Sequence, residues 1–163
     1  MRLVLGIAPL SLAAMGAFAQ GTLQSFGWFG DLAGSCWVSV HVNGVSEHTM
    51  CYSTQFGTFI RATTALAELR EGKREVSLES DAVFRWNESS RRIAFSIWFS
   101  DGTYNERDAE FVGDELHFPI FREYRQVWRR IDADTIEVRA ERRQESGWTT
   151  EHTFVYRRLA AEN

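Results

Sequence analysis

Several polar side chains of this chain alternate with apolar residues, in a pattern that could recognise an acidic group. In the strand registers that the turns dictate, they share one face with aromatic residues. The resulting candidate ligand-binding residues are Arg107, Asn105, His152, Arg129, Tyr156, Phe95 and Phe84. An arginine inside an apolar interior needs an anion, a carboxylate or water as partner. We therefore expect a pocket for a small apolar or amphipathic molecule that can carry an acid; a satisfied internal polar network with ordered water is the alternative.

The four histidines are the only other residues that suggest a metal or haem site. His41 and His48 share a face of the first predicted hairpin but lie diagonally rather than opposite each other. His117 is expected opposite Glu110 on the outer face. The chain has no H-x-x-x-H motif and no cysteine cluster, so we expect no metal and no cofactor. An axial haem ligand at His152 is a weaker alternative.

Catalytic motifs are also absent from the sequence. There is no G-x-S-x-G element, and the acids Glu106, Asp108 and Glu110 alternate as on a solvated strand face. We expect no catalytic residues, although a cofactor-free enzyme using His152 and Arg107 stays open as an alternative. A third class is a protein-binding or inhibitor module that acts through its loops, of which 53–59, "STQFGTF", is the most apolar.

The two cysteines of the chain flank an Asn-Gly pair in "CWVSVHVNGVSEHTMC" (36–51). A two-residue turn at Asn43-Gly44 places Cys36 directly opposite Cys51. We therefore predict a disulfide between the first two strands, with two free buried thiols as the alternative. In this register the pair is of the hydrogen-bonded type, whose Cα atoms lie about 5.5 Å apart.

Residues 1–19 have the features of a secretory signal peptide: Arg2, an uncharged apolar run, and Ala17-Phe18-Ala19 before Gln20. We expect residues 20–163 to form one domain in a secreted or periplasmic protein. No later run is long and apolar enough to span a membrane, so no integral membrane segment is expected after cleavage. The net charge of −4 makes nucleic acid an improbable partner.

The positioning elements are predicted to be strands joined by hairpins, because the pattern has period two and is interrupted by turn signals. A loop at 100–102 pairs Ile97 with Asn105 and Phe95 with Arg107, and it keeps the three acids on the other face. The neighbouring hairpins pair Phe84 with Phe95, Phe111 with Leu116, and Ala109 with Phe118. A turn at Ala133-Asp134 pairs Arg129 with Val138, and the last hairpin pairs Ala140 with His152 and Ile136 with Tyr156.

These hairpins share one apolar face that must be buried. The sequence therefore predicts an all-β fold, a single antiparallel up-and-down β-barrel of about eight to ten strands. A two-sheet sandwich is the alternative. Residues 26–33, "FGWFGDLA", predict a short helical lead-in, and 65–73, "ALAELREGK", is a second, weaker helix candidate.

The segment "FGDLAGSCWVSV" resembles the opening of the lipocalin-like (calycin) barrels, in which a first-strand Trp lies near the closed end against an Arg from the last strand. The matching positions are Trp37 and Arg157 or Arg158. The chain departs from the lipocalin Gly-x-Trp pattern, since it reads Gly34-Ser35-Cys36-Trp37. It is more similar to uncharacterised secreted bacterial proteins with an "AGSCW…CY…QFGTFIR" pattern. The resemblance implies a barrel that binds a small molecule in its interior.

Overall fold

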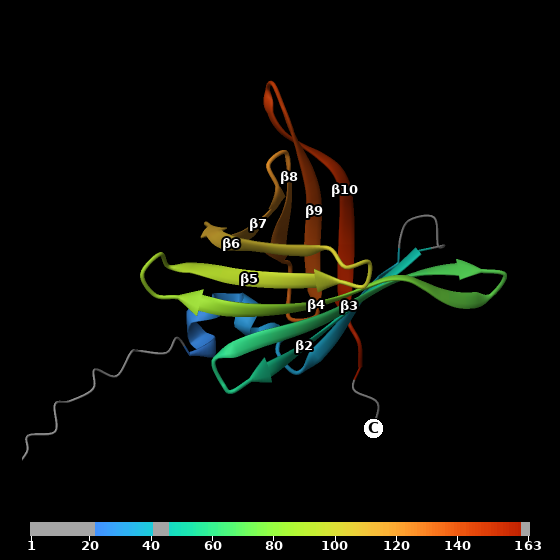
Figure 1. Cartoon of the computed structure of the whole chain (residues 1–163), viewed down its shortest axis with the longest axis horizontal. Helices are drawn as coiled ribbons and strands as arrows, with labels where there is room; N and C mark the ends of the chain where they lie inside the picture. Colours follow the sequence, from blue (N-terminus) through green and yellow to red (C-terminus); the bar gives the residue numbers. More distant parts are fainter. Residues whose placement is uncertain (1–21, 41–45, 161–163) are drawn as a thin grey trace, which may run out of the picture.

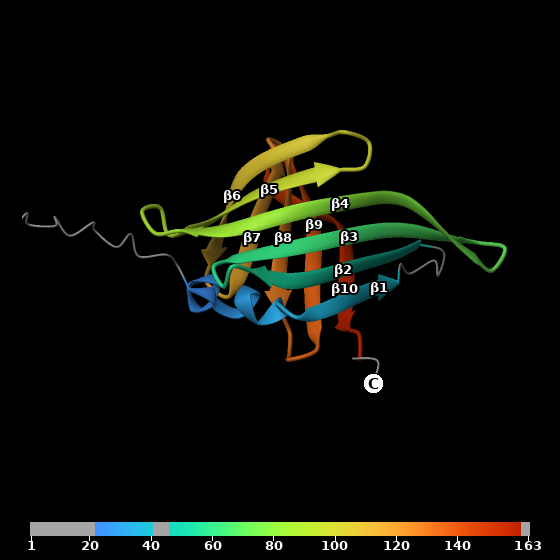
Figure 2. The same ribbon diagram turned by 60° about the horizontal axis from the view of Figure 1, so that its bottom comes forward.

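The computed structural model describes residues 22–40 and 46–160, which form a closed barrel of ten antiparallel strands. Each strand pairs with its neighbours in the sequence, and β1 pairs with β10 to close the sheet. In Figure 1, β2 to β5 lie across the view and β8 to β10 stand upright in it, so the two halves of the barrel cross (Figure 2). The strands are β1 (Ser35–Val40), β2 (Ser46–Gln55), β3 (Phe59–Arg70), β4 (Lys73–Asn87), β5 (Arg92–Phe99), β6 (Tyr104–Val112), β7 (Glu115–Phe121), β8 (Tyr124–Arg130), β9 (Thr135–Gln144) and β10 (Gly147–Arg158). The predicted up-and-down barrel is confirmed.

The predicted lead-in is a 3-10 helix, η1 (Leu23–Leu32), which covers one end of the barrel. Phe26, Phe29 and Leu32 are fully buried there. The ring of Phe29 lies 5.1 Å from the ring of Phe84 and 5.8 Å from that of Phe118, centroid to centroid. Gly30 allows the tight winding, because a Cβ at this position would lie 2.4 Å from the carbonyl oxygen of Leu23. This helix closes the end of the barrel through aromatic packing.

The second helix candidate, 65–73, is wrong, because most of it belongs to β3. Its alanines and leucines have good helix propensity. β3 nevertheless pairs with β2 from Phe59 to Glu68 and with β4 from Phe59 to Arg70. Pairing on both edges outweighs local propensity, as is usual inside a closed sheet.

The hairpin registers around β5 are as predicted. Phe95 pairs with Phe84 on β4 and with Arg107 on β6. The 100–102 loop places Gly102 at φ +88°, the left-handed conformation that this loop type requires. Glu106 and Asp108 are exposed, and Glu110 is partly exposed, as the register predicts.

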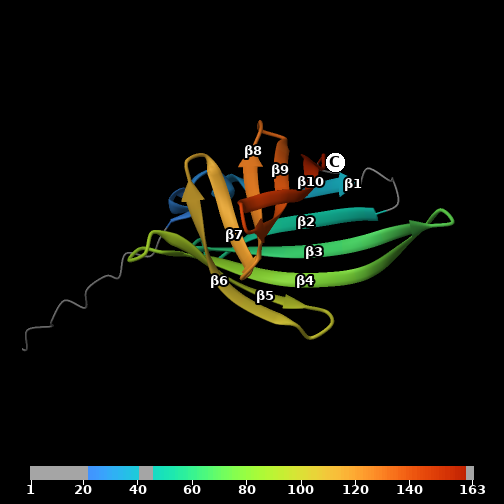
Figure 3. The ribbon, with the colours of Figure 1, turned by 90° about the horizontal axis from the view of Figure 1, so that it is seen from above.

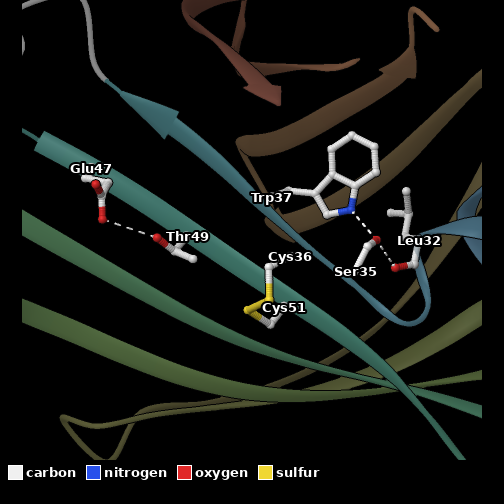
Figure 4. Close-up of a disulfide and its surroundings, with 7 residues drawn as sticks. All are labelled: Leu32, Ser35, Cys36, Trp37, Glu47, Thr49 and Cys51. Carbon is white, nitrogen blue, oxygen red and sulfur yellow. Dashed lines mark hydrogen bonds between the residues drawn. A yellow bond between two sulfur atoms is a disulfide. The ribbon is translucent and has the colours of Figure 1, made fainter. Parts of the chain in front are cut away.

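The first hairpin carries a disulfide between Cys36 and Cys51, with the two residues in the predicted register (Figure 4). Their Cα atoms are 4.0 Å apart, which corrects the expected spacing of about 5.5 Å for a hydrogen-bonded pair. The reason lies on the other edge of β1: the carbonyl of Cys36 accepts a hydrogen bond from the Leu159 amide at 2.8 Å. The backbone of Cys36 therefore forms its hydrogen bond on the β10 side. On the β2 side, Cys36 and Cys51 form a non-hydrogen-bonded pair, in which the Cα atoms lie closer together. The Asn43-Gly44 turn lies outside the described residues.

The predicted β8–β9 register is wrong by one residue. The loop spans three residues, 132–134, and is closed by the Ile131 amide bonding to the Thr135 carbonyl at 3.0 Å. The Asp132 carboxylate accepts the Asp134 amide at 2.8 Å, an Asx turn that stabilises this longer loop. Trp128 thus pairs with Val138, and Arg129 pairs with Glu137. A one-residue slip reverses the faces, so Trp128 points into the barrel and Arg129 points out.

The β6–β7 ladder is shorter than predicted, since it ends at the Glu110–His117 pair and never joins Ala109 to Phe118. If the register continued, Asp108 would face Pro119, which has no N–H to donate. Figure 3 shows β6 continuing beside β5 while β7 turns toward β8. We call this region, 104–109 of β6 and 118–121 of β7, the β6–β7 pairing gap.

Candidate functional site

The interior of the barrel holds a largely apolar cavity of about 170 Å³ that is partly open to solvent. Phe84 and Phe118 contribute to its lining and also contact Phe29 of η1, so the helix lies beneath the cavity floor. Large apolar and aromatic side chains dominate the lining: Met50, Tyr52, Leu66, Leu78, Phe84, Phe95, Ile97, Phe99, Phe118, Ile120 and Trp128. Its polar lining residues are few: His48, Thr64, Glu79, Ser80 and Gln126, apart from the tyrosine hydroxyl. An apolar cavity with a few placed polar groups is the usual form of a small-molecule site.

His48 is the main titratable group in the cavity wall. Its Nδ1 is hydrogen-bonded to the hydroxyl of Tyr156, which is 2% exposed. Burial lowers the pKa of His48 below its ordinary value of 6.5, so the ring is neutral at pH 7. Burial also raises the pKa of Tyr156, so the phenol keeps its proton and donates it to Nδ1. In that tautomer, Nε2 carries the ring hydrogen and is a hydrogen-bond donor.

Gln126 is a second polar group in the lining, and it is held in place by its neighbours. The indole Nε1 of Trp128 donates to Gln126 Oε1 at 3.1 Å. Tyr124 also hydrogen-bonds to Gln126. This arrangement fixes the indole of Trp128 in the cavity wall, where its fluorescence can report on bound molecules.

Three of the predicted ligand-binding residues lie in or directly behind the cavity. Phe84 and Phe95 line it, and their rings stack with centroids 6.0 Å apart. Tyr156 reaches it through the hydrogen bond to His48. A fourth, Asn105, is 9% exposed and donates from Nδ2 to the carbonyl of Ile120 at 2.9 Å, and this bond crosses the β6–β7 pairing gap. The predicted inward placement of Asn105 is thus correct, but its role is to bridge two strands.

The other three predicted residues do not line the cavity. Arg129 lies on the outer face and forms an ion pair with Glu137 at 3.0 Å, because the β8–β9 register slipped. Arg107 pairs with Phe95 as predicted, yet its side chain is exposed and donates to the carbonyl of Glu106 at 2.7 Å. His152 pairs with Ala140 as predicted but is exposed, next to a β-bulge in β10. An acid–base pair of His152 and Arg107 therefore has no place in the cavity lining.

The structural pair predicted at the closed end involves Arg158 rather than Arg157. Trp37 is fully buried and pairs with Arg158, whose guanidinium lies 5.0 Å from the indole ring centroid. Arg157 faces the other way and hydrogen-bonds to the Thr135 hydroxyl at 3.3 Å. The side chain of Ser35 connects this tryptophan to η1, because it accepts from Trp37 Nε1 at 2.9 Å and donates to the Leu32 carbonyl at 2.6 Å (Figure 4).

Arginine and glutamate side chains form a network of ion pairs on the outer face of β7 to β9. Glu141 is 6% exposed and contacts Arg125 at 2.7 Å and Arg139 at 3.3 Å. Arg139 also contacts Glu115 at 2.7 Å. Burial by itself would raise the pKa of Glu115, but hydrogen bonding and attraction to Arg139 outweigh it and lower that pKa. The network is structural, because its groups satisfy one another on the outside of the sheet.

His48, Met50, Tyr52 and Trp128 are site residues that sequence reasoning missed. A signal for the first three was present: Trp37 pairs with Met50, so its inward position places every second residue of β2 inside. Trp128 was hidden by the one-residue error in the loop after β8. The contact of His48 with Tyr156 had no local signal, because the two residues are 108 positions apart.

Among residues 22–40 and 46–160, no cluster of three or more His, Cys, Asp or Glu side chains is placed to hold a metal ion. In the same part of the chain, no helix is long and apolar enough to cross a membrane. No model of a known protein family matches the chain, and no curated protein matches its sequence.

Proposed function

We propose that this protein binds a small apolar or amphipathic molecule inside its barrel. The observation that carries the proposal is the apolar cavity of about 170 Å³, whose wall includes His48 of the His48–Tyr156 pair. A dry apolar cavity of about 150 Å³ in another protein is enough to bind benzene. The size of the cavity thus suits one ring or a short branched chain, and Nε2–H of His48 suits a hydrogen-bond acceptor on the ligand.

The fold supports the lipocalin-like part of this proposal. A closed up-and-down barrel, a helix at one end and a buried first-strand tryptophan under an arginine of the last strand are the features that the resemblance implies. The lipocalin-like family is therefore proposed as the relative of this chain on structural grounds.

Export from the cytoplasm is part of the same proposal. The Cys36–Cys51 bond suits an oxidising compartment such as the periplasm or the outside of the cell. The signal-like segment 1–19 lies outside the described residues and agrees with such a location.

Toluene is a suitable first probe, because it is apolar and close in size to the cavity. We expect it to quench or shift the fluorescence of Trp128 and to raise the melting temperature. Ala82→Leu adds bulk to a lining position on β4 and should abolish binding, whereas Val83→Leu on the outer face of the same strand should not. Toluene binding that is absent from the wild type, or unchanged in Ala82→Leu, would contradict the proposal.

A loop-mediated protein-binding function is the second candidate, and Phe56 favours it. This residue lies in the β2–β3 turn, with φ +55°, and is 84% exposed. Exposed aromatic residues are common anchors of protein interfaces. Crosslinking in the native host should recover one specific protein with the wild type and lose it with Phe56→Ser, while Val155→Ser, at another exposed apolar residue, should retain it. Equal recovery with both variants would rule out the Phe56 anchor.

A further inference from the structure

A recess of about 480 Å³ on the outside of the barrel adjoins the β6–β7 pairing gap. Four arginines line it, together with two aromatic residues: Arg92, Arg107, Arg122, Arg125, Phe121 and Trp148. We call it the arginine recess. Its other charged lining residues are two acids, Asp108 and Glu110, which leaves a local charge of +2 (four minus two) in a chain whose net charge is −4. A local positive charge in an acidic protein attracts an anion.

Two of these arginines already have partners. Arg92 pairs with Glu110 at 2.6 Å, and Arg125 pairs with Glu141 at 2.7 Å while its guanidinium lies 4.3 Å from the ring centroid of Trp148. The other two differ. Within the described ranges, Arg107 and Arg122 form no ion pair with a carboxylate, and the partner of Arg107 is the backbone carbonyl of Glu106. Their guanidinium groups can therefore bind an oxyanion without breaking a salt bridge.

Arg107 connects this recess with the interior. Its strand position faces inward, because it is paired with Phe95, which lines the cavity. Its exposed side chain nevertheless lines the outer recess. The pairing gap makes this possible, since no backbone pairing with β7 encloses residues 104–109. Burying a guanidinium without a partner is unfavourable, so the extension of Arg107 toward solvent through the gap is the favourable conformation.

The cavity and the recess lie on opposite faces of β7 at this point. Ile120 lines the cavity, and its neighbours Pro119 and Phe121 line the recess. A single side-chain hydrogen bond, from Asn105 Nδ2 to the Ile120 carbonyl, crosses the gap here in place of a β-ladder. One such bond is much weaker than a continuous ladder, so the two strands can separate here more easily than along their paired residues 110–112 and 115–117.

We propose that an acidic amphiphile binds across the β6–β7 pairing gap, with its apolar part in the cavity and its carboxylate or other oxyanion on Arg107 and Arg122 in the arginine recess. This inference rests on the proposed function and specifies its ligand class. The acid is held from outside the barrel, so the interior remains apolar. Asn105 releases the Ile120 carbonyl when the chain of the ligand passes between the strands.

The experiment compares 4-phenylbutyrate with 4-phenylbutanol, which share the ring and chain but differ in charge. We expect the acid to bind the wild type about tenfold more tightly than the alcohol, a difference that shrinks as salt screens the contact. Arg107→Met should reduce the affinity for the acid to that for the alcohol and leave the alcohol unchanged. Arg129→Met removes the same charge from the outer face of β8, away from the recess, and should change neither affinity.

The outcomes separate the two proposals. Equal binding of acid and alcohol by the wild type, or an equal loss of both in Arg107→Met, would overturn the placement of the anion while the apolar cavity site stands. Acid binding that survives Ala82→Leu would show an independent surface anion site and would also overturn it. Failure of both probes and of toluene to bind would overturn the proposed function together with this inference.

Discussion

The hydroxyl of Tyr156 on β10 is hydrogen-bonded to Nδ1 of His48 on β2, across β1, which lies between them in the sheet. Both side chains point into the barrel, where Tyr156 is 2% exposed. The two rings also touch, with centroids 5.7 Å apart. The pair stabilises the part of the barrel where the first and last strands meet, and it places the imidazole in the cavity wall.

Loss of this hydrogen bond should destabilise the fold. Tyr156→Phe leaves the buried Nδ1 of His48 without its donor, so we expect the free energy of unfolding to fall by about 1–3 kcal/mol. Denaturant unfolding followed by tryptophan fluorescence measures it. Tyr104→Phe is the matched control, because the hydroxyl of Tyr104 bonds to Glu106 on the exposed surface; its expected effect is within about 0.5 kcal/mol. Equal effects of the two substitutions would contradict the importance of the buried pair.

Mild acid should weaken the folded state through His48. Its pKa is lowered in the folded protein, so as the pH falls through about 6.5 the unfolded chain binds a proton that the folded chain resists. The free energy of unfolding should therefore decrease in this range. Asp101, Asp132 and Glu115 also have lowered pKa values, but as carboxyls they act at lower pH. Urea unfolding at several pH values tests this, and a slope that persists in His48→Gln would assign it to another group.

Tyr52 and Tyr156 should resist ionisation in alkali. Burial raises the pKa of both phenols above the ordinary 10.0. The unfolded state therefore loses protons above that pH that the folded state retains, and stability should fall as the pH rises. Ultraviolet titration should show fewer ionising tyrosines than the four in the sequence until the protein unfolds. All four ionising together below the unfolding pH would show that the interior is open to hydroxide.

Reduction of the disulfide should cost about 3 kcal/mol, the value expected for a loop of about 15 residues. The two cysteines are 15 positions apart. Thiol titration of the denatured, unreduced protein should find no free thiol, and Cys36→Ser with Cys51→Ser should lower the melting temperature while retaining the barrel circular dichroism. Two reactive thiols in the unreduced protein would contradict the bond.

Acidic side chains on the outer surface should contribute to the free energy of unfolding according to how deeply they are buried. Asp108 is exposed, so Asp108→Asn should change the free energy of unfolding by about 0.5 kcal/mol or less. Glu141 is 6% exposed and bound by Arg125 and Arg139, so Glu141→Gln should cost about 1–3 kcal/mol. Denaturant unfolding of both variants provides the comparison, and a larger loss from Asp108→Asn would mean that the β6 faces are reversed.

Features that depend on local turns and on the period of two were accessible from the sequence. The turn positions gave the register of Cys36 with Cys51, of Phe95 with Arg107 and of Ile136 with Tyr156, and the structure confirms all three. Each register follows from a short loop, and for Phe95 with Arg107 also from the cost of burying carboxylates, so neighbouring residues are sufficient to predict it. The one continuous apolar face favoured a closed barrel, with a two-sheet sandwich as the alternative, and the pairing of β1 with β10 shows the barrel.

Only the tertiary structure decided how the ends of the sheet meet and where the ladder breaks. The contact of His48 with Tyr156 and the choice of Arg158 over Arg157 beside Trp37 depend on the closure of β1 against β10, which no local pattern specifies. Arg107 occupies the predicted inward strand position. Its guanidinium nevertheless extends to the outer recess, through a gap that exists because β6 and β7 diverge. Strand divergence and barrel closure arise from the packing of all ten strands together, whereas a register arises from one turn.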